Sequence, residues 1–297
     1  MKLEESQTAR AHVDLVEDYF DAHSREWSDL YATVREVNDL VLLNRKAIAI
    51  DFLCRELEPS PLVRVLDAGC GAGLASLDVA RKGFYVQGFD VSDGMLDQCR
   101  RRFSAEGVPA DRYSFMRADL LDSDFPAASF DGVLALGFLQ YLPDEHQALL
   151  ALNRLLSSGG ILVVSGPTKA KISNYFGVLR LIKNVKRALR GSYPFRLLKK
   201  AKDALLGRRQ TESNSHRVLR DISRHTYSPG RFEKLLREAG FEIVRWQGHG
   251  FAGFPFLKRL LGFRGELFLH RFLSRLASFL PIGRWANDIV VLAKKRN

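Results

Sequence analysis

The chain has 297 residues, of which 46% are hydrophobic and 27% are charged, with 23 Gly and 10 Pro. This length and composition suit a large α/β domain or two small domains with a substantial core, and they exclude collagen-like, low-complexity and wholly disordered chains. Three cysteines, Cys54, Cys70 and Cys99, cannot build a disulfide framework and do not have metal-ligand spacing. We therefore expect a cytoplasmic protein without a bound metal.

The net charge of +11 is unevenly distributed along the chain. Residues 167–225 hold 16 Lys and Arg against three acidic residues, and residues 251–286 combine basic residues with a single acid, Glu266. The rest of the chain is mildly acidic, so these two segments are the ones that call for an anionic partner. The sequence shows no apolar stretch long enough to predict a signal peptide or a membrane-spanning helix.

Helical periodicity opens the chain. Apolar residues at three- and four-residue spacing predict a helix over residues 9–31, and a second helix is expected over residues 33–57, before Pro59. From residue 63 onward, short β-rich runs alternate with helical segments. The expected strands cover residues 63–68, 84–92, 113–119, 130–137, 159–166, 241–250 and 287–295, and the expected helices between them cover 76–83, 94–106, 144–157 and 229–240. This alternation predicts an α/β fold, a doubly wound parallel sheet with helices on both faces.

A glycine-rich turn, Asp67-Ala68-Gly69-Cys70-Gly71-Ala72-Gly73, joins the first expected strand to its helix. Glycines there let the backbone approach a ligand, and a helix N-terminus offers unpaired N–H groups. The dinucleotide pattern GxGxxG fails because residue 74 is Leu, and the phosphate-binding Lys-Ser/Thr pair is absent. What remains is GxGxG after an acid, with a second acid, Asp90, at the end of the next strand, where it can accept both hydroxyls of a ribose.

These segments resemble the class I S-adenosylmethionine-dependent methyltransferases. VLDAGCGAG matches the first motif of that family, FDVSDGML the second, RADL the adenine-contacting motif, and FDGVLALGFLQYLPD and LLSSGGILVVSGP the fourth and fifth strands. The resemblance implies a seven-stranded Rossmann-like sheet with a reversed final hairpin. It also implies a helical lid over residues 1–60 and a methyltransferase domain over 61–297, interrupted by helical insertions at 167–225 and 251–286.

The resemblance further implies how the cofactor, S-adenosylmethionine, would be held. The three glycines approach its methionyl part, Asp67 lies near its amino group and Asp90 holds the ribose. Met95 packs on the adenine, Asp119 accepts a hydrogen bond from the adenine amine, and the backbone around Leu136–Phe138 closes the pocket. The cofactor-binding residues expected in this way are Tyr19, Arg45, Asp67, Gly69, Gly71, Gly73, Asp90, Val91, Met95, Asp119, Leu120 and Leu136.

The helical segment YFDAHSREWSDLY resembles the entry helices of methyltransferases that act on quinone-like and porphyrin-like acceptors. By that resemblance Tyr19, Phe20, Trp27 and Tyr31 form a lid over the cofactor, and Arg45 meets its carboxylate. Purely structural roles stay open for all of these residues. The aromatic side chains can pack an amphipathic helix onto the body, Asp90 can cap the helix near Ser92, and Met95 can fill the core.

Methyl transfer can be catalysed by proximity and orientation alone, so a general base is optional. His216 and His225 precede the point where the sheet resumes, and Tyr141 follows the fourth strand, which makes these three the candidates for contacting an acceptor or removing its proton. Each of them also has a plain interpretation as a packing or surface residue.

The basic segment 167–225 interleaves cations with apolar side chains at helical spacing, the pattern of a helix on an anionic lipid surface. The sequence therefore predicts a methyltransferase for a hydrophobic or lipid-linked small molecule at the inner face of a membrane, with oxygen as the favoured acceptor atom. An RNA methyltransferase is disfavoured, because LGFLQYLP replaces the Asn/Asp-Pro-Pro-Tyr signature and no RNA-binding motif is evident. A non-catalytic cofactor-binding scaffold stays open as an alternative, as does a solvated cationic cap.

Overall fold

The computed structural model describes residues 2–30, 37–168, 225–251, 255–277 and 285–296, together with residues 222 and 283. Its centre is a seven-stranded sheet in the order β3-β2-β1-β4-β5-β7-β6. The strands are β1 Arg64–Ala68, β2 Tyr85–Asp90, β3 Tyr113–Arg117, β4 Phe130–Leu136, β5 Leu156–Pro167, β6 Phe241–His249 and β7 Asp288–Lys295. Strand β7 runs antiparallel to both β5 and β6, and the other neighbouring pairs are parallel. The expected seven-stranded α/β sheet with a reversed final hairpin is confirmed.

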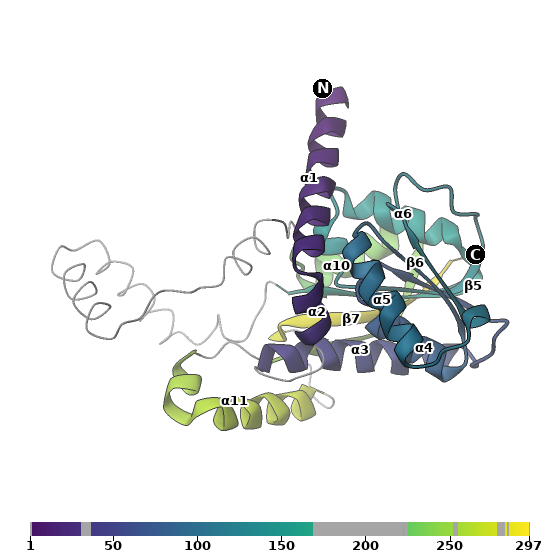
Figure 1. Cartoon of the computed structure of the whole chain (residues 1–297). Coiled ribbons are helices and arrows are strands. Elements are labelled where there is room, and N and C mark those ends of the chain that lie inside the picture. The colour runs from purple at the N-terminus through teal and green to yellow at the C-terminus, as the bar shows by residue number, and fades with distance from the viewer. Residues whose placement is uncertain are drawn as a thin grey trace.

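Helices cover both faces of the sheet (Figure 1). Helix α3 packs against β4, β5 and β7, and α4 and α5 pack beside it against β1 to β3, whereas α6 and α10 lie on the other face. Helix α11 contacts α3 and β6 on the outer side of the first layer. The helices are α1 Lys2–Ala22, α2 Ser24–Leu30, α3 Val37–Glu56, α4 Leu74–Lys82, α5 Asp93–Ala105, α6 Glu145–Leu155, α10 Pro229–Glu238 and α11 Pro255–Ala277, with the short 3-10 turns η1 Ala110–Arg112 and η2 Leu139–Tyr141.

Successive residues of the central strands contribute to two separate cores. Leu66 belongs to the core under α6 and α10, whereas its neighbour Val65 belongs to the core under α3 and α4. The same alternation holds in β4, where Val133 and Leu134 point to opposite sides. Side chains in a strand alternate with a period of two, so strands buried on both faces read as continuous apolar runs. This is why the strands were visible in the sequence as short apolar segments.

The N-terminal helical segment differs from the expectation of one helix over residues 9–31. Helix α1 begins at Lys2 and ends at Ala22, and α2 follows after a break at His23. The ring of His23 hydrogen bonds to the backbone carbonyl of Tyr19, with 2.8 Å between Nδ1 and the oxygen. A side chain that competes for a helix carbonyl favours a local break of this kind.

Of the two expected insertions, only the second is largely described by the structure. Most of the segment 167–225 lies outside the described residues, but its ends meet, since Thr168 and Tyr227 form a parallel bridge and the Tyr227 N–H donates to Pro167 O at 2.8 Å. The segment between β6 and β7 contains α11, which is kinked at Gly262. Within the described ranges, no helix is both long enough and apolar enough to cross a bilayer.

Candidate functional site

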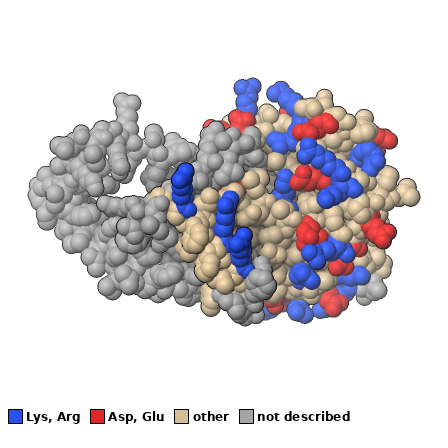
Figure 2. Space-filling model, turned by 90° about the horizontal axis from the view of Figure 1, so that it is seen from below, with Lys and Arg blue, Asp and Glu red and all other residues tan. Residues whose placement is uncertain are grey.

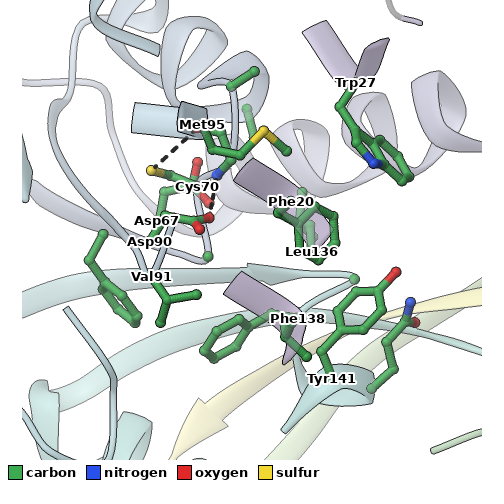
Figure 3. Close-up of a pocket in the computed structure, with 18 of the residues that line it drawn as sticks. Phe20, Trp27, Asp67, Cys70, Asp90, Val91, Met95, Leu136, Phe138 and Tyr141 are labelled. Atoms are coloured by element: carbon green, nitrogen blue, oxygen red, sulfur yellow. Dashed lines mark hydrogen bonds between the residues drawn. The ribbon is translucent and has the colours of Figure 1, made fainter. Parts of the chain in front are cut away.

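The glycine-rich turn between β1 and α4 forms the floor of a pocket at the carboxyl ends of the parallel strands (Figure 3). Gly71 has a φ of 51°, a left-handed conformation that favours glycine, and its N–H donates to Oδ2 of Asp90 at 2.9 Å. The neighbouring helix α4 begins at Gly73 without a side-chain cap. An uncapped helix N-terminus presents unpaired N–H groups, which suits a carboxylate or other anionic ligand group.

Asp67, near the end of β1, is only 2% exposed and accepts a hydrogen bond of 2.5 Å from the Ser76 hydroxyl. Burial raises the pKa of Asp67 to about 6, and the nearby Asp90 carboxylate contributes to the same shift. A buried carboxylate that is costly to ionise becomes easier to ionise when a cation binds beside it. The position therefore suits a ligand that carries a positive charge.

Asp90 ends β2, the strand next to β1. Its Oδ1 accepts from the Ser92 N–H at 3.0 Å, in addition to the Gly71 bond on Oδ2. Burial raises the pKa of Asp90 to about 6, although these backbone hydrogen bonds oppose the shift. Helix α5 is capped by Ser92, whose hydroxyl accepts from the Met95 N–H, so Asp90 is not the cap of that helix. Each carboxylate oxygen has a second lone pair with which to accept a hydroxyl group.

Aromatic side chains form the opposite side of the pocket. Phe20 of α1 lies edge-on to Tyr141 of η2, with ring centroids 5.3 Å apart, and 5.8 Å from Trp27 of α2. Figure 3 shows these three rings across the cavity from Asp67, Asp90 and Met95. The pocket thus has an acidic polar end and an apolar aromatic end.

The first helix is fastened to the body beside this pocket. Asp21 of α1 accepts from the Ser92 hydroxyl and, at 2.8 Å, from the Gly94 N–H at the start of α5. Arg117 of β3 pairs with Glu17 of α1. A carboxylate close to the N-terminus of a helix is also favoured by the helix dipole. These contacts hold α1 where its apolar face covers the strand ends.

Arg45 of α3 also lines the pocket. Its guanidinium lies 3.6 Å from Oδ2 of Asp288 and against Gly137, where an added Cβ would come within 2.5 Å of Nη1. His249 is buried nearby, and burial, followed by the charge of Arg45, lowers its pKa to about 3. The neutral imidazole therefore adds no second positive charge next to Arg45.

Comparison with known proteins identifies the family. The model of the methyltransferase domain family matches residues 66–164. A ubiquinone biosynthesis O-methyltransferase of Alkalilimnicola ehrlichii is 30% identical over 54% of this chain and 62% of its own length. One from Pseudomonas aeruginosa is 30% identical over 56% of this chain and 69% of its own length. The chain belongs to the class I S-adenosylmethionine-dependent methyltransferases.

Two further similarities complete this comparison. Methyltransferase GfsG of Streptomyces halstedii is 32% identical over 49% of this chain and 59% of its own length. The chain thus spans less than two thirds of the length of some of these relatives, the one from Alkalilimnicola ehrlichii included. Magnesium protoporphyrin IX methyltransferase from Synechocystis PCC 6803 has a TM-score of 0.59 at 16% identity, with 95% of this chain and 99% of that chain covered. This last likeness shows a shared fold.

In this methyltransferase most of the expected cofactor-binding residues come together. Those that line the pocket are Arg45, Asp67, Gly69, Gly71, Asp90, Val91, Met95, Asp119, Leu120 and Leu136. Tyr141, expected on the acceptor side, also lines it, as do Phe20 and Trp27 of the expected lid. S-adenosylmethionine is the cofactor of this family, and the acidic end of the pocket fits a cationic ligand of that kind.

Four other expected residues either do not line the pocket or lie outside the described residues. Tyr19 is not among the residues that line the pocket and is only 5% exposed. It packs with Val16 and Ile222, and its ring stacks on the His23 ring with centroids 4.5 Å apart. Gly73 caps α4, and an added Cβ there would overlap Sγ of Cys99 at 2.3 Å, so its glycine is explained by packing. His216 and Tyr31 lie outside the described residues.

His225 is in the structural framework behind the pocket and does not line it. Its Nδ1 lies 3.1 Å from the buried Glu145 carboxylate, which also pairs with Arg231, and its Nε2 lies 2.9 Å from the Leu142 carbonyl. His225 is absent from the described residues that line the pocket, and these contacts give its ring a structural role. A role for His225 as a general base stays a prediction.

Several residues of the pocket were missed. Val13, Val16, Leu42, Lys46 and Gln140 line it. The apolar spacing of Val13 and Val16 was visible, but periodicity identifies the buried face of a helix and not what that face covers. Lys46, which pairs with Asp78, and Gln140 carried no motif in the sequence.

Proposed function

We propose that this chain transfers the methyl group of S-adenosylmethionine to an oxygen atom of a hydrophobic small molecule, of the quinone or lipid-linked type, at the inner surface of a membrane. The observation that carries the proposal is the two-ended pocket. Asp67 and Asp90 form its polar end, and Phe20, Trp27 and Tyr141 form its apolar end. The names of the ubiquinone biosynthesis relatives support the acceptor class and the acceptor atom.

The residues at the polar end suit distinct parts of the cofactor. Asp90 retains acceptor capacity for the ribose hydroxyls, and Asp67 offers a buried negative charge for the amino group. The uncapped start of α4 and the Arg45 guanidinium suit the carboxylate. Asp119 lines the pocket at the place where an adenine amine would be bound. Its Oδ1 accepts a hydrogen bond from the Leu121 N–H.

When bound, the cofactor would supply a methyl group on a positively charged sulfur. The nucleophile of the acceptor would attack the methyl carbon in line with that sulfur, which leaves as a neutral thioether. The chain contributes orientation and the exclusion of water, because α1 and α2 cover the strand ends with apolar side chains and serve as the proposed lid. Among the described residues that line the pocket there is no histidine. Tyr141 is the lining residue best placed to contact the acceptor, since its ring faces the apolar end (Figure 3).

Membrane-surface action is supported by the two basic segments. Residues 167–225 combine 16 Lys and Arg with bulky apolar residues, and both ends of this segment meet beside η2, where the His225 N–H contacts the Gln140 carbonyl at 3.4 Å. A lipid-bound segment at this place would bring a lipid-linked acceptor close to the apolar end of the pocket.

Methyl-labelled S-adenosylmethionine tests the proposal directly. The full chain is incubated with the cofactor and a cell lipid extract, and labelled products are identified by mass spectrometry, with fragmentation to assign the methylated atom. The proposal predicts a labelled methoxy group on a quinone-type or lipid-linked product. Label in RNA, or binding of the cofactor without any labelled product from extracts of soluble and lipid metabolites, would contradict it. Gly71→Val, which should not bind the cofactor, is the negative control.

A further inference from the structure

Helix α11 presents a stripe of mixed chemistry to the solvent. After the kink at Gly262, the long side chains of α11 that are described and exposed are Arg264, Phe268, Arg271, Phe272 and Arg275. Spacings of three and four residues place them on one face of the helix. Phe268 is 72% exposed and Phe272 is 50% exposed, and their rings stack with centroids 6.3 Å apart. Two adjacent, largely exposed phenylalanines are unusual on a soluble surface without a partner.

The opposite face of α11 is fixed to the body. Leu269 and Leu273, which follow the kink at Gly262, pack with Phe251 and Ala286. His270 is 2% exposed and hydrogen bonds to Asn44 of α3 and to the Phe251 N–H, at 3.2 and 3.3 Å. The helix therefore cannot rotate to bury its phenylalanines without losing these contacts. The exposed stripe is held outward.

The charges around the phenylalanines indicate the kind of partner. The three arginines flank the two rings along the helix, and Glu266 is the single acidic residue between positions 251 and 286. Figure 2 shows basic side chains in a row on this side of the molecule, on a tan surface where none of the described residues beside them is acidic. Trp285, which precedes Ala286 in the chain, is 42% exposed. Arginines and aromatic rings of this arrangement suit the boundary between lipid headgroups and acyl chains.

The size of the stripe argues against a protein partner as its occupant. One face of about three helical turns is small compared with the roughly 800 Å² that each partner of a stable complex buries. A bilayer does not require a complementary shape, and it accepts a narrow amphipathic face.

We propose that the stripe of Arg264, Phe268, Arg271, Phe272 and Arg275 docks on a bilayer that carries anionic phospholipids. The phenyl rings enter the outer edge of the acyl region, and the guanidinium groups bind lipid phosphates. The inference rests on the membrane-surface part of the proposed function and identifies a contact surface on α11 that is separate from the basic segment 167–225.

Vesicle sedimentation of the full chain tests this surface. Vesicles of phosphatidylcholine alone are compared with vesicles that also contain phosphatidylglycerol, at low and high salt. The F268S/F272S variant should bind the mixed vesicles at least about tenfold more weakly at high salt, where apolar contacts persist. The R264Q/R271Q/R275Q variant should bind about a hundredfold more weakly at low salt. Matched controls elsewhere on the surface are V244S and R100Q/R101Q/R237Q, and they should bind as the unmodified protein does.

A second measurement does not require any of these variants to fold. Brominated lipids quench tryptophan fluorescence on contact, so vesicles containing them should quench the unmodified protein, and W285F should remove most of that quenching. Calorimetry with S-adenosylmethionine reports separately on the pocket, so a failed cofactor measurement counts against the proposed methyl transfer and not against the docking surface.

Three results would overturn the inference. The first is that the α11 variants bind mixed vesicles as tightly as the unmodified protein does, which would assign all lipid binding to other segments. The second is that the unmodified protein does not bind mixed vesicles at low salt. The third is that the unmodified protein forms a dimer that F268S/F272S abolishes, which would make the stripe a protein interface.

Discussion

Oδ2 of Asp90 accepts a hydrogen bond of 2.9 Å from the backbone N–H of Gly71. This bond joins the acidic end of β2 to the glycine-rich turn that follows β1, although the sequence pattern presents the two as separate ligand contacts. The turn conformation and the orientation of the carboxylate therefore depend on one another. A change at either residue should affect the ligand through both.

Replacing Asp90 by alanine should weaken the binding of S-adenosylmethionine by about 1.5–3 kcal/mol, the range for hydrogen bonds that involve a charged group. Asp90→Asn should lose less, because its amide oxygen can still accept one bond. Calorimetry on folded variants measures both effects. Asp97→Ala, which removes an exposed carboxylate of α5, is the control. Unchanged affinity in Asp90→Ala would show that the ribose is held elsewhere.

The affinity for the cofactor should rise with pH and level off above pH 7. Burial raises the pKa of both Asp67 and Asp90 to about 6, so near pH 5 each carboxyl is largely protonated and a cationic ligand gains little from it. One such group corresponds to about a tenfold loss of affinity per pH unit below its pKa. Titration calorimetry at pH 5, 6 and 7 measures this, and Asp67→Asn should flatten the dependence. A flat profile in the unmodified protein would contradict a cationic ligand group beside these acids.

The stability of the ligand-free protein should change with pH in the opposite direction to the cofactor affinity, because of the same raised pKa values. The folded state binds more protons than the unfolded state between pH 4 and pH 6, because the carboxyl groups titrate near 3.8 when unfolded and near 6 when folded. The free energy of unfolding should therefore fall as the pH rises through this interval. Chemical denaturation with and without the cofactor checks the sign, since a bound cation should reduce the fall.

Gly107 is a matched control for Gly71, because it also has a positive φ but does not line the pocket. Gly71 and Gly107 have φ values of 51° and 63°, and an added Cβ meets only Met95 Cε at 3.6 Å in the first case and nothing within 4 Å in the second. Alanine at either position should cost about 1–2 kcal/mol of stability. Gly71→Val should also abolish cofactor binding, whereas Gly107→Val should leave it intact. Normal cofactor binding by Gly71→Val would place the ligand away from this turn.

The sequence predicted the parts of this molecule that depend on local patterns. Apolar strand runs and the Gly-rich turn are readable because strand alternation and positive φ angles constrain single residues and their neighbours. The carboxyl ends of adjacent parallel strands then bring Asp67 and Asp90 together, so this pair followed from topology.

Contacts between distant segments were not predictable in this way. Asp21 accepts a hydrogen bond at the start of α5 from a residue more than 70 positions away in the sequence. Glu145 pairs with Arg231 and His225, which also lie far from it in the sequence. No local propensity distinguishes these residues from surface charges. Their neighbours follow from how α1 and α10 pack, which is why Tyr19 and His225 were assigned to the pocket and Asp21 was not assigned to any site.

Replacing His225 should lower stability and leave the chemistry in place. His225→Gln removes a donor to the buried Glu145 carboxylate or to the Leu142 carbonyl, which should cost about 1–3 kcal/mol of unfolding free energy. The pH dependence of the methyl-transfer rate should keep its shape, because His225 does not face the pocket. Urea unfolding and a pH–rate profile measure the two effects, with His146→Gln as the control. A folded His225→Gln variant in which the rate no longer falls at acidic pH would support the role of general base.

Reversing four charges in the basic segment should release the protein from acidic membranes. Lys183, Lys186, Arg187 and Arg190 lie outside the described residues, so this prediction depends on the sequence, where cations alternate with apolar residues at helical spacing. Each basic residue near an anionic surface contributes about 1 kcal/mol, so four reversals to Glu should weaken vesicle binding about a thousandfold or more at low salt, with cofactor affinity unchanged. Reversal of the same number of exposed arginines elsewhere controls for net charge; these are Arg100, Arg101, Arg154 and Arg237. Equal losses in both variants would mean that overall charge governs the interaction, and tight binding to structured RNA with none to vesicles would contradict a membrane role for the segment.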